Sequence, residues 1–303
     1  MNYDIIIVGG GPAGLTAALY ALRANKSVLV IEKSAFGGQI TLSPLVENIP
    51  GHPALSGNDF AAKLVDQVLE QGAELEPAEV IGIRIGENDL KIVVTEDCEY
   101  TAKAVIIATG AKHRMLGLPN EEELVGSGIS YCAVCDGAFY QGKTVGVIGG
   151  GNSALQEALL LSDLAEKVII VQNLDFLTGE QRLQERLSQK KNIEIILGST
   201  VAELKGDGML NGIVIQEQGG NKREIALDGL FVAIGLVPQN EAFADIIELD
   251  GTGYAASDES CITKSAGIFA AGDCRTKRIR QVTTAASDGA IAALAACEYC
   301  DTY

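Results

Sequence analysis

Two cysteines separated by two residues, with an acid directly after them, offer the clearest chemistry in this chain. Cys132 and Cys135 can close a small disulfide ring, and the first thiol of such a pair often has a depressed pKa. The pair can therefore accept two electrons and pass them on by thiol–disulfide exchange. Asp136 adds a proton donor for a leaving thiolate, provided that burial raises the pKa of this carboxyl. The pattern predicts a redox dithiol.

Half of a structural zinc site is the alternative interpretation of the same two cysteines. Zinc needs two further ligands, and the other CxxC pair, Cys297 and Cys300, stands far away near the end of the chain. That terminal pair could relay electrons outward, or it could simply share one face of a terminal helix. We expect no metal, and we expect Cys98, Cys261 and Cys274 to be small buried hydrophobic residues.

Composition narrows the setting of this chemistry. The 303 residues are enough for two domains, and a formal net charge of −17 argues against nucleic acid or an anionic membrane as a partner. The chain runs at once into the apolar strand Ile5 to Val8, and no apolar run approaches membrane-spanning length. Seven cysteines without regular spacing fit a reducing compartment, so we expect a cytoplasmic protein.

The opening of the chain predicts a dinucleotide site. The strand Ile5 to Val8 leads into the glycine loop Gly9 to Gly14 and then into a helix over Leu15 to Ala24. Such glycines allow the tight turn and let a pyrophosphate approach the start of the helix. A second strand, Val28 to Ile31, ends at Glu32, where a dinucleotide fold places a carboxylate for ribose hydroxyls.

The middle of the chain repeats this pattern. The strand Thr144 to Ile148 is followed by the glycine loop Gly149 to Ala154, the helix Leu155 to Leu164 and the strand Lys167 to Val171. Two such units on one chain predict two nucleotide-shaped sites.

The second site lacks the side chains that select a pyridine nucleotide. An NAD site would have an acid at the strand end, and an NADP site would have arginine for the 2′-phosphate. The segment Gln172 to Thr178 has no acid before Asp175, and no Lys or Arg stands between Lys167 and Arg182. The sequence therefore predicts a pyridine-nucleotide fold without its recognition chemistry.

The whole pattern predicts an α/β fold of two Rossmann-like dinucleotide-binding domains with three layers each, the second inserted in the first. Residues 1–112 and 241–303 would form the first domain, and residues 113–240 the second, which carries the CxxC motif. We expect His52 and His113 to be exposed loop residues. The further predicted elements are a helix over Asp59 to Gln71, a meander over Val80 to Val94, strands over Ala104 to Gly110, Ile193 to Leu197, Gly212 to Gln218, Gly229 to Ile234 and Gly267 to Asp273, and a helix over Gln281 to Ala296.

Together these motifs resemble the low-molecular-weight thioredoxin reductases over essentially the whole chain. The matching motifs are Gly9 to Gly14, Gly37 to Gln39, Glu47 and Asn48, Ala108 to Gly110, Cys132 to Asp136, Gly149 to Ala154, Gly272 and Asp273, and Arg280 to Val282. The resemblance implies FAD as cofactor, thioredoxin as disulfide substrate, a homodimer, and rotation of the central domain about Ala111 to Leu118 and Leu236 to Asn240.

The resemblance also implies residue roles. By position, Cys135 would face the flavin, Cys132 would attack thioredoxin, and Asp136 would be the acid. The implied FAD contacts are Gly9, Gly11, Pro12, Ala13, Gly14, Glu32, Lys33, Gly38, Gln39, Asn48, Thr109, Gly110, Asp273, Arg280, Gln281 and Val282.

One departure from the family pattern concerns the electron donor. Members that use NADPH carry a His-Arg-Arg run and a further arginine where this chain has Gln172 to Leu174 and Thr178. The lost charge-assisted hydrogen bonds would lower NADPH affinity by orders of magnitude. The chain is therefore most similar to the ferredoxin-dependent flavin thioredoxin reductases, and ferredoxin is the expected donor. The four cations within Arg275 to Arg280 are either its landing site or a solvated loop.

Three alternatives stay open at this point. The first is an NAD(P)H-dependent thioredoxin reductase with an atypical nucleotide site, and the second is a diflavin-linked disulfide oxidoreductase. The third is a flavin-bound redox sensor that does not turn over. The joint presence of Cys132, Cys135 and Asp136 weighs against the sensor.

Overall fold

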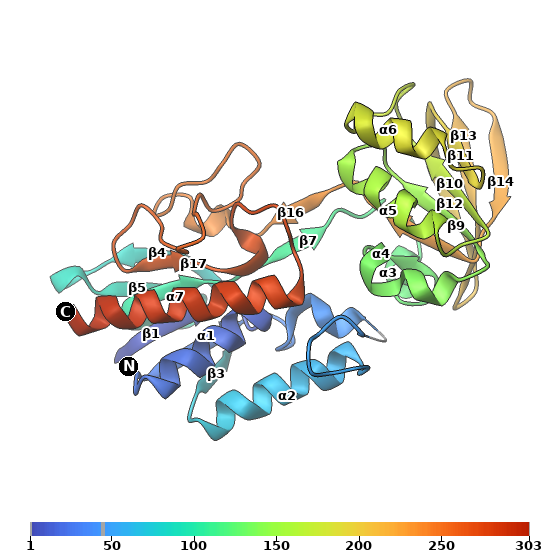
Figure 1. Ribbon diagram of the computed structural model, residues 1–303. Helices are drawn as coiled ribbons and strands as arrows, with labels where there is room; N and C mark the ends of the chain where they lie inside the picture. The colour runs from blue at the N-terminus through green and yellow to red at the C-terminus, as the bar shows by residue number, and fades with distance from the viewer. Residues whose placement is uncertain (1, 44–45, 303) are drawn as a thin grey trace. The chain divides into compact units, whose positions relative to one another are not determined.

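The chain folds into two compact units, shown in the computed structural model of Figure 1, which describes residues 2–43 and 46–302. The first unit comprises Met1–Lys112 and Val237–Tyr303, and the second comprises His113–Leu236. The predicted second domain ends at Asn240, whereas in the structure the chain returns to the first unit earlier, at Val237. Asn240 is buried, and its side chain donates to the carbonyl oxygens of Gly253 at 3.0 Å and Cys274 at 2.8 Å, which anchors it in the first unit.

The first unit is built on a seven-stranded sheet of order β3-β2-β1-β6-β5-β4, in which β17 pairs with β6. The central strands are parallel, while β4, β5 and the first part of β6 form the predicted antiparallel meander. Its strands are β1 (Asn2–Val8), β2 (Val28–Glu32), β3 (Glu74–Pro77), β4 (Val80–Ile85), β5 (Lys91–Thr95), β6 (Glu99–Ile107) and β17 (Ile268–Ala270). Its α-helices are α1 (Pro12–Arg23), α2 (Gly57–Glu70) and α7 (Val282–Thr302).

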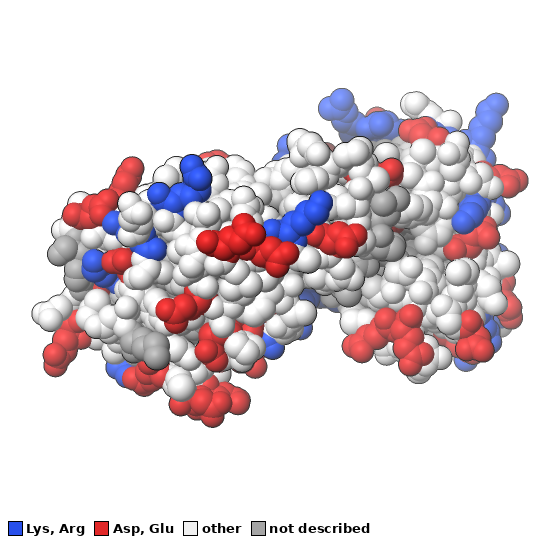
Figure 2. All heavy atoms as spheres, turned by 90° about the horizontal axis from the view of Figure 1, so that it is seen from below, with Lys and Arg blue, Asp and Glu red and all other residues white. Residues whose placement is uncertain are grey.

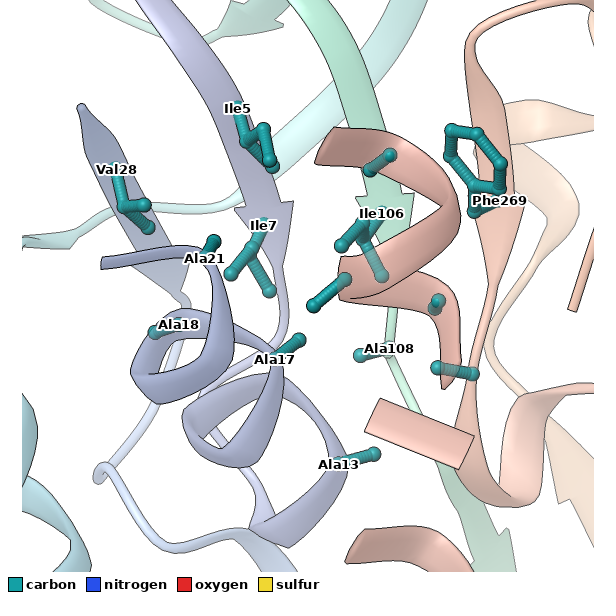
Figure 3. Close-up of a cluster of buried hydrophobic side chains, with 14 of the residues drawn as sticks. Ile5, Ile7, Ala13, Ala17, Ala18, Ala21, Val28, Ile106, Ala108 and Phe269 are labelled. Atoms are coloured by element: carbon teal, nitrogen blue, oxygen red, sulfur yellow. The ribbon is translucent and has the colours of Figure 1, made fainter. Parts of the chain in front are cut away.

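Helices α1 and α7 cover one face of this sheet through small side chains. Ala13, Ala17 and Ala21 of α1 point into a buried cluster with Ile7 and Ile106 of the central strands (Figure 3). The two helices approach closely because α7 has Gly289 at their crossing, where an added Cβ would lie 2.1 Å from the carbonyl oxygen of Ala13. The alanine-rich composition of the terminal helix is therefore a packing requirement.

The opposite face of the sheet carries a second layer. Ile6 and Val8 of β1 share a buried cluster with Val80 and Val93 of the meander and with Phe243. Helices, parallel strands and meander thus form three layers in this unit, and the α/β prediction is confirmed.

The second unit repeats the architecture around a parallel sheet of order β11-β10-β9-β15-β8. A three-stranded antiparallel sheet, β12-β13-β14, packs in the same unit; only β13 was predicted. The strands are β8 (Ile129–Ser130), β9 (Thr144–Ile148), β10 (Lys167–Val171), β11 (Ile193–Ile196), β12 (Ser199–Gly206), β13 (Leu210–Glu217), β14 (Lys222–Ala226) and β15 (Gly229–Val232). The α-helices are α3 (Glu121–Leu124), α4 (Ala133–Asp136), α5 (Asn152–Ser162) and α6 (Gln181–Ser188).

The chain crosses between the units at two strands, β7 (Ala111–His113) and β16 (Leu236–Pro238), which pair with each other. On the face shown in Figure 2, Asp and Glu side chains gather in several groups with Lys and Arg among them. Across the described residues, none of the helices is long and apolar enough to cross a membrane.

Candidate active site

The CxxC motif forms the start of the short helix α4. Cys132 and Cys135 are joined by a disulfide, with Cα atoms 5.3 Å apart. Cys132 is the N-cap residue, and the backbone N–H groups of Cys135 and Asp136 donate to its carbonyl oxygen at 3.1 and 3.0 Å. Both cysteines are half-buried, while Val134 between them is 59% exposed. The disulfide is therefore only partly shielded by the protein around it.

Asp136 lies behind this disulfide in a setting that favours its protonated form. Ser130 Oγ donates to Asp136 Oδ2 at 2.6 Å and accepts the N–H of Cys132 at 3.1 Å. Asp136 Oδ1 is buried without a hydrogen-bond partner. Burial raises the pKa of this carboxyl, and the bond from Ser130 only partly opposes the shift. A raised pKa is what a proton donor to a leaving thiolate requires.

His113 is not the exposed loop residue that the sequence suggested. Its ring stacks on Tyr131, the residue before Cys132, with ring centroids 4.8 Å apart, and burial lowers its pKa to about 4. The Tyr131 hydroxyl donates to Glu121 Oε1 at 3.2 Å. Glu121 is 1% exposed and also accepts the N–H groups of Leu116 and Gly117 at 2.9 and 2.8 Å. The segment that enters the second unit is thus fixed next to the CxxC motif.

The first glycine loop lies at the carboxyl edge of β1. Gly9 has φ +113°, and an added Cβ would lie 2.3 Å from the carbonyl oxygen of Ala108. A Cβ on Gly14 would lie 1.9 Å from the Gly9 carbonyl oxygen, so the start of α1 packs directly on the loop. Pro12 occupies the first turn of α1, and Ala13 is buried. By contrast, a Cβ at Gly11 would meet nothing nearer than Gly38 Cα at 3.9 Å, which leaves space for a ligand in front of the helix.

Glu32 closes the loop on its other side. Gly10 N–H donates to Glu32 Oε2 at 2.8 Å, and Ser34 donates to Oε1 through both its N–H and its hydroxyl at 2.9 Å. The neighbouring Lys33 is exposed and pairs with Glu79 at 3.0 Å. Glu32 is therefore held where β2 ends, at the same sheet edge as the glycines.

Further predicted contact residues come from four other segments of the first unit. Gly38 has φ +66°, and Gln39 donates to the carbonyl oxygen of Ala111. Asn48 Nδ2 donates to Gln281 Oε1 at 3.2 Å, which joins two segments far apart in the sequence. The remaining members are Thr109, whose hydroxyl donates to Asn240 Oδ1 at 3.0 Å, Gly110 with φ +69°, and Val282 at the start of α7.

Asp273 provides the strongest indication of a bound group in this unit. Its Oδ1 is one of three buried side-chain oxygens without a partner in the described part of the chain, and burial raises the pKa of the carboxyl. Gly272, directly before it, has φ +78°. An unpartnered buried acceptor beside an open glycine loop fits a ligand with hydroxyl groups, such as the ribityl chain and ribose of FAD.

The prediction that Arg275 to Arg280 form an exposed basic patch for ferredoxin is wrong, because only part of the segment is exposed. The side chains of Arg275 and Lys277 are 1% and 5% exposed, and both pair with the buried Asp288 of α7 at 2.8 Å. Arg280 is half-buried and stacks over the Tyr254 ring at 4.2 Å. Arg278 is exposed. Arg275 and Lys277 thus serve as the partners of a buried carboxylate.

The second glycine loop copies the backbone of the first. Gly149 has φ +126°, and an added Cβ there would lie 2.5 Å from the carbonyl oxygen of Ala233. An added Cβ on Gly9 would meet the carbonyl oxygen of Ala108 in the same way. Thr178 N–H donates to the Gly150 carbonyl oxygen at 2.9 Å, just as Gly37 N–H donates to Gly10 at 2.7 Å. The strand, turn and helix of a nucleotide site are therefore all present.

The side chains of this second loop differ from those of the first. Gln172 stands where β10 ends, is 5% exposed, and lies against Gly150, whose added Cβ would be 2.6 Å from Gln172 Cδ. Its Nε2 donates to the carbonyl oxygen of Phe176 at 3.4 Å. Asn152 and Glu180 exchange two hydrogen bonds of 3.0 and 2.7 Å at the start of α5, which adds a carboxylate there. These three side chains at the loop, Gln172, Asn152 and Glu180, are thus two amides and one acid.

The other cysteines take no part in a second redox pair in the structure. Cys297 and Cys300 are buried in α7, and burial raises the pKa of both thiols, to about 11 for Cys300. Cys261 and Cys274 are buried as expected, whereas Cys98 is exposed, contrary to the prediction. Within residues 2–43 and 46–302, no group of three or more His, Cys, Asp and Glu side chains is placed to hold a metal ion.

Comparison with known proteins identifies the family. Residues 3–289 match the family described as pyridine nucleotide-disulphide oxidoreductase. A thioredoxin reductase of Treponema pallidum is 43% identical over 99% of this chain and 98% of its own length. A protein of Clostridium pasteurianum, named a 34.2 kDa protein in rubredoxin operon, is 44% identical over 98% of this chain and 96% of its own.

The solved structures agree with the sequence comparison. The crystal structure of thioredoxin reductase from Streptococcus pyogenes superimposes with a TM-score of 0.93 at 40% identity, covering 100% of this chain and 99% of that one. Its two dinucleotide-binding domains correspond to the two α/β units described above. The chain belongs to the pyridine nucleotide-disulphide oxidoreductases and, within them, to the FAD-dependent low-molecular-weight thioredoxin reductases.

Proposed function

We propose that this chain reduces the disulfide of thioredoxin through Cys132 and Cys135, with electrons that an iron–sulfur protein such as ferredoxin delivers to FAD. The substrate is supported by the names of the relatives. The donor is supported by the side chains around the second glycine loop, above all by Gln172.

The residues of the first unit would hold FAD at the carboxyl edge of β1. We assign the pyrophosphate to the glycine loop and the start of α1, because backbone N–H groups and the helix dipole favour a phosphate there. Glu32 would accept hydrogen bonds from ribose hydroxyls. Asp273 Oδ1, which has no partner within the protein, would accept a hydrogen bond from a hydroxyl of the cofactor. FAD, when bound, can accept electrons singly or in pairs and pass a pair to a disulfide.

The CxxC motif would carry out the exchange with thioredoxin. Two electrons break the Cys132–Cys135 bond and leave two sulfur anions, and Asp136 gives a proton to one of them. The Cys132 thiolate then attacks the disulfide of thioredoxin, forming a mixed disulfide and releasing a thiolate of the substrate. Cys135 returns its proton to Asp136 and attacks the Cys132 sulfur of the mixed disulfide, which frees the second thiolate of thioredoxin and restores the Cys132–Cys135 bond.

The donor proposal rests on one observation, the buried Gln172 at the end of β10. In the first unit the equivalent Glu32 receives the loop N–H of Gly10 at 2.8 Å, but at the second loop a neutral amide packs on Gly150. The following residues Asn173 to Thr178 bring one charge, the acid Asp175, and Glu180 adds another carboxylate. A 2′-phosphate would meet negative charge where it needs arginine.

The alternative is that the second loop binds NADPH or NADH through backbone groups alone. The intact backbone of Gly149 to Gly151 favours this possibility. The Clostridium pasteurianum relative, named for a rubredoxin operon, favours the ferredoxin-type donor, since rubredoxin is also an iron-containing electron carrier.

Anaerobic reduction of the FAD-loaded protein distinguishes these two donors. Flavin absorbance is followed with NADPH, with NADH and with reduced ferredoxin in separate cuvettes, and then with thioredoxin added. We expect bleaching by ferredoxin and none by either pyridine nucleotide at micromolar concentration. Fast bleaching by NADPH would refute the donor while leaving the thioredoxin step intact.

A variant with restored cations sharpens this test. Asn173→Arg, Leu174→Arg and Thr178→Arg together replace exposed side chains, so they should fold and should introduce NADPH-dependent bleaching with a preference over NADH. Replacing Lys190 and Lys191 by arginine in the same unit is the control and should introduce none. The homodimer and the cytoplasmic location stay predictions, the former testable by light scattering.

A further inference from the structure

A buried carboxyl that the proposed steps do not use lies against the CxxC motif. Glu157 belongs to α5, the helix that follows the second glycine loop and packs against α4. The backbone N–H of Ala133, the residue directly after Cys132, lies near enough to the Glu157 carboxyl to lower its pKa. Its Oε2 is fully buried and has no partner. Ala133 also shares a buried cluster with Ala154, Ala158 and Leu161, so Glu157 lies on the face of α5 that packs against the CxxC helix.

The rarity of such atoms gives this observation weight. In residues 2–43 and 46–302, three buried side-chain oxygens lack a hydrogen-bond partner, and the other two belong to Asp136 and Asp273. Both of those are assigned to the reaction, one as acid and one as cofactor contact. An unpaired buried carboxyl oxygen costs free energy and needs a reason.

The surroundings of Glu157 are apolar. Ala154, Leu155, Ala158 and Leu161 of the same helix are buried in one cluster with Ala133. Burial raises the pKa of Glu157 to about 7, and the N–H of Ala133 opposes the shift only in part. The ionisable groups on the elements packed against α5 are Cys132, Cys135 and Asp136 at α4, the exposed Arg182, Glu185 and Arg186 of α6, and the exposed Lys167 at the start of β10.

We propose that Glu157 is a positioning residue whose charge, acting through Ala133, sets how readily the Cys132 thiol ionises. A protonated Glu157 leaves the thiolate next to a neutral group, whereas an ionised Glu157 places a second negative charge beside it and favours the thiol. Ionisation of the two groups is therefore coupled, and each raises the proton affinity of the other. The inference rests on the proposed attack by Cys132, but not on the identity of the electron donor.

The pH profile of Cys132 alkylation tests this coupling. In the FAD-loaded Cys135→Ser protein, Cys132 is the one free thiol of the motif, and iodoacetamide labelling is followed by mass spectrometry from pH 5.5 to 9.5. We expect a broad profile in which the gain in rate flattens near pH 7, where Glu157 ionises. Adding Glu157→Gln, which removes the charge and nearly keeps the size of the side chain, should give a single step whose midpoint is lower by on the order of one pH unit.

A matched control removes the same charge elsewhere. Glu166→Gln in the Cys135→Ser background alters an exposed carboxylate of the same unit and should leave the profile as it was. A Glu157→Gln profile that superimposes on this control overturns the inference. This outcome is independent of whether the protein with both cysteines reduces thioredoxin. A wrong electron donor, by contrast, cannot affect this assay, because it uses none.

Infrared spectroscopy of the wild-type protein covers the case in which Glu157→Gln fails to fold. Protein labelled with ¹³C-glutamate, which leaves Asp136 unlabelled, is compared in its oxidised and dithiol forms near pH 6.5. We expect an isotope-shifted band of a protonated glutamic acid that changes on reduction of the disulfide. The absence of such a band overturns the inference.

Discussion

Replacing Asp288 by asparagine tests whether a buried ion cluster holds the first unit together. Asp288 is 3% exposed and accepts from Arg275 Nε at 2.8 Å, Arg275 Nη2 at 2.9 Å and Lys277 Nζ at 2.8 Å. It also accepts the N–H of Gly272 at 3.0 Å, so it fixes the backbone directly before Asp273. The variant leaves Lys277 without its carboxylate and leaves Arg275 with the exposed Glu259, at 3.3 Å, as its remaining carboxylate partner.

The cost follows from the burial of all three side chains. Removing one partner of a buried pair costs about 3–5 kcal/mol of unfolding free energy, because the remaining charge is left in a poor solvent. For a unit of this size we expect Tm to fall by roughly 10 °C. Thermal unfolding is followed by circular dichroism with saturating FAD, so that cofactor loss does not contribute. Glu99→Gln, which breaks an exposed pair with Arg84 in the same unit, should cost less than about 1 kcal/mol.

The pH dependence provides an independent check on the same cluster. Burial raises the pKa of Asp288, but the hydrogen bonds and charges of Arg275 and Lys277 outweigh this effect and hold it below its usual value. A carboxyl with a lowered folded pKa contributes stability above its unfolded pKa of about 3.9 and loses it as pH falls further. The gap between wild type and Asp288→Asn should thus be full at pH 6 and shrink below about pH 4. A variant that melts within a few degrees of Glu99→Gln at pH 6 would refute the reasoning.

Three further predictions follow from the site. Asp136→Asn should slow thioredoxin reduction about 10²-fold or more while the FAD content is unchanged. The substitution removes the proposed proton donor but keeps an oxygen that accepts the Ser130 hydroxyl. Stopped-flow turnover with reduced ferredoxin measures the rate. Cys297→Ser with Cys300→Ser should leave turnover unchanged in the same assay, because both thiols are buried with raised pKa values, and a large loss would restore the relay. Glu157→Gln should become more stable relative to wild type as pH rises from 5 to 8. A carboxyl with a folded pKa of about 7 binds its proton more tightly in the folded state, so the stability of the wild type falls as pH rises through this range. Urea unfolding at pH 5 and at pH 8 measures the difference in stability, and the same difference at both pH values would contradict the prediction.

The sequence predicts the parallel strands well because each is a short apolar run between glycine turns. Ile5 to Val8 and Lys167 to Val171 both lie in sheets as expected. The strand β14, Lys222–Ala226, was missed because one of its five residues is buried, so the pattern has no apolar repeat. Its place is set by antiparallel pairing with β13, which local propensity does not encode.

The residues proposed to react can be predicted from the sequence, while the groups around them cannot. Cys132, Cys135 and Asp136 are adjacent in the chain, so their chemistry can be inferred from spacing alone. Glu157 reads as an ordinary acid in a helix, and its burial against Ala133 depends on how α5 packs on α4. Asp288 is likewise one acid in an alanine-rich helix, and without its contacts the cations of Arg275 to Arg280 were taken for a surface.

The glycine at position 149 shows that packing alone can require one residue of a nucleotide-loop pattern. A Cβ there would meet the carbonyl oxygen of Ala233 whether or not a nucleotide is bound, so strand and helix packing alone forbids any other residue. Selection for a stable fold therefore preserves this part of the loop, while selection for a cofactor acts on side chains such as Gln172. Under the proposed function, one electron source replaces another through a few side-chain substitutions around this loop, with no new architecture.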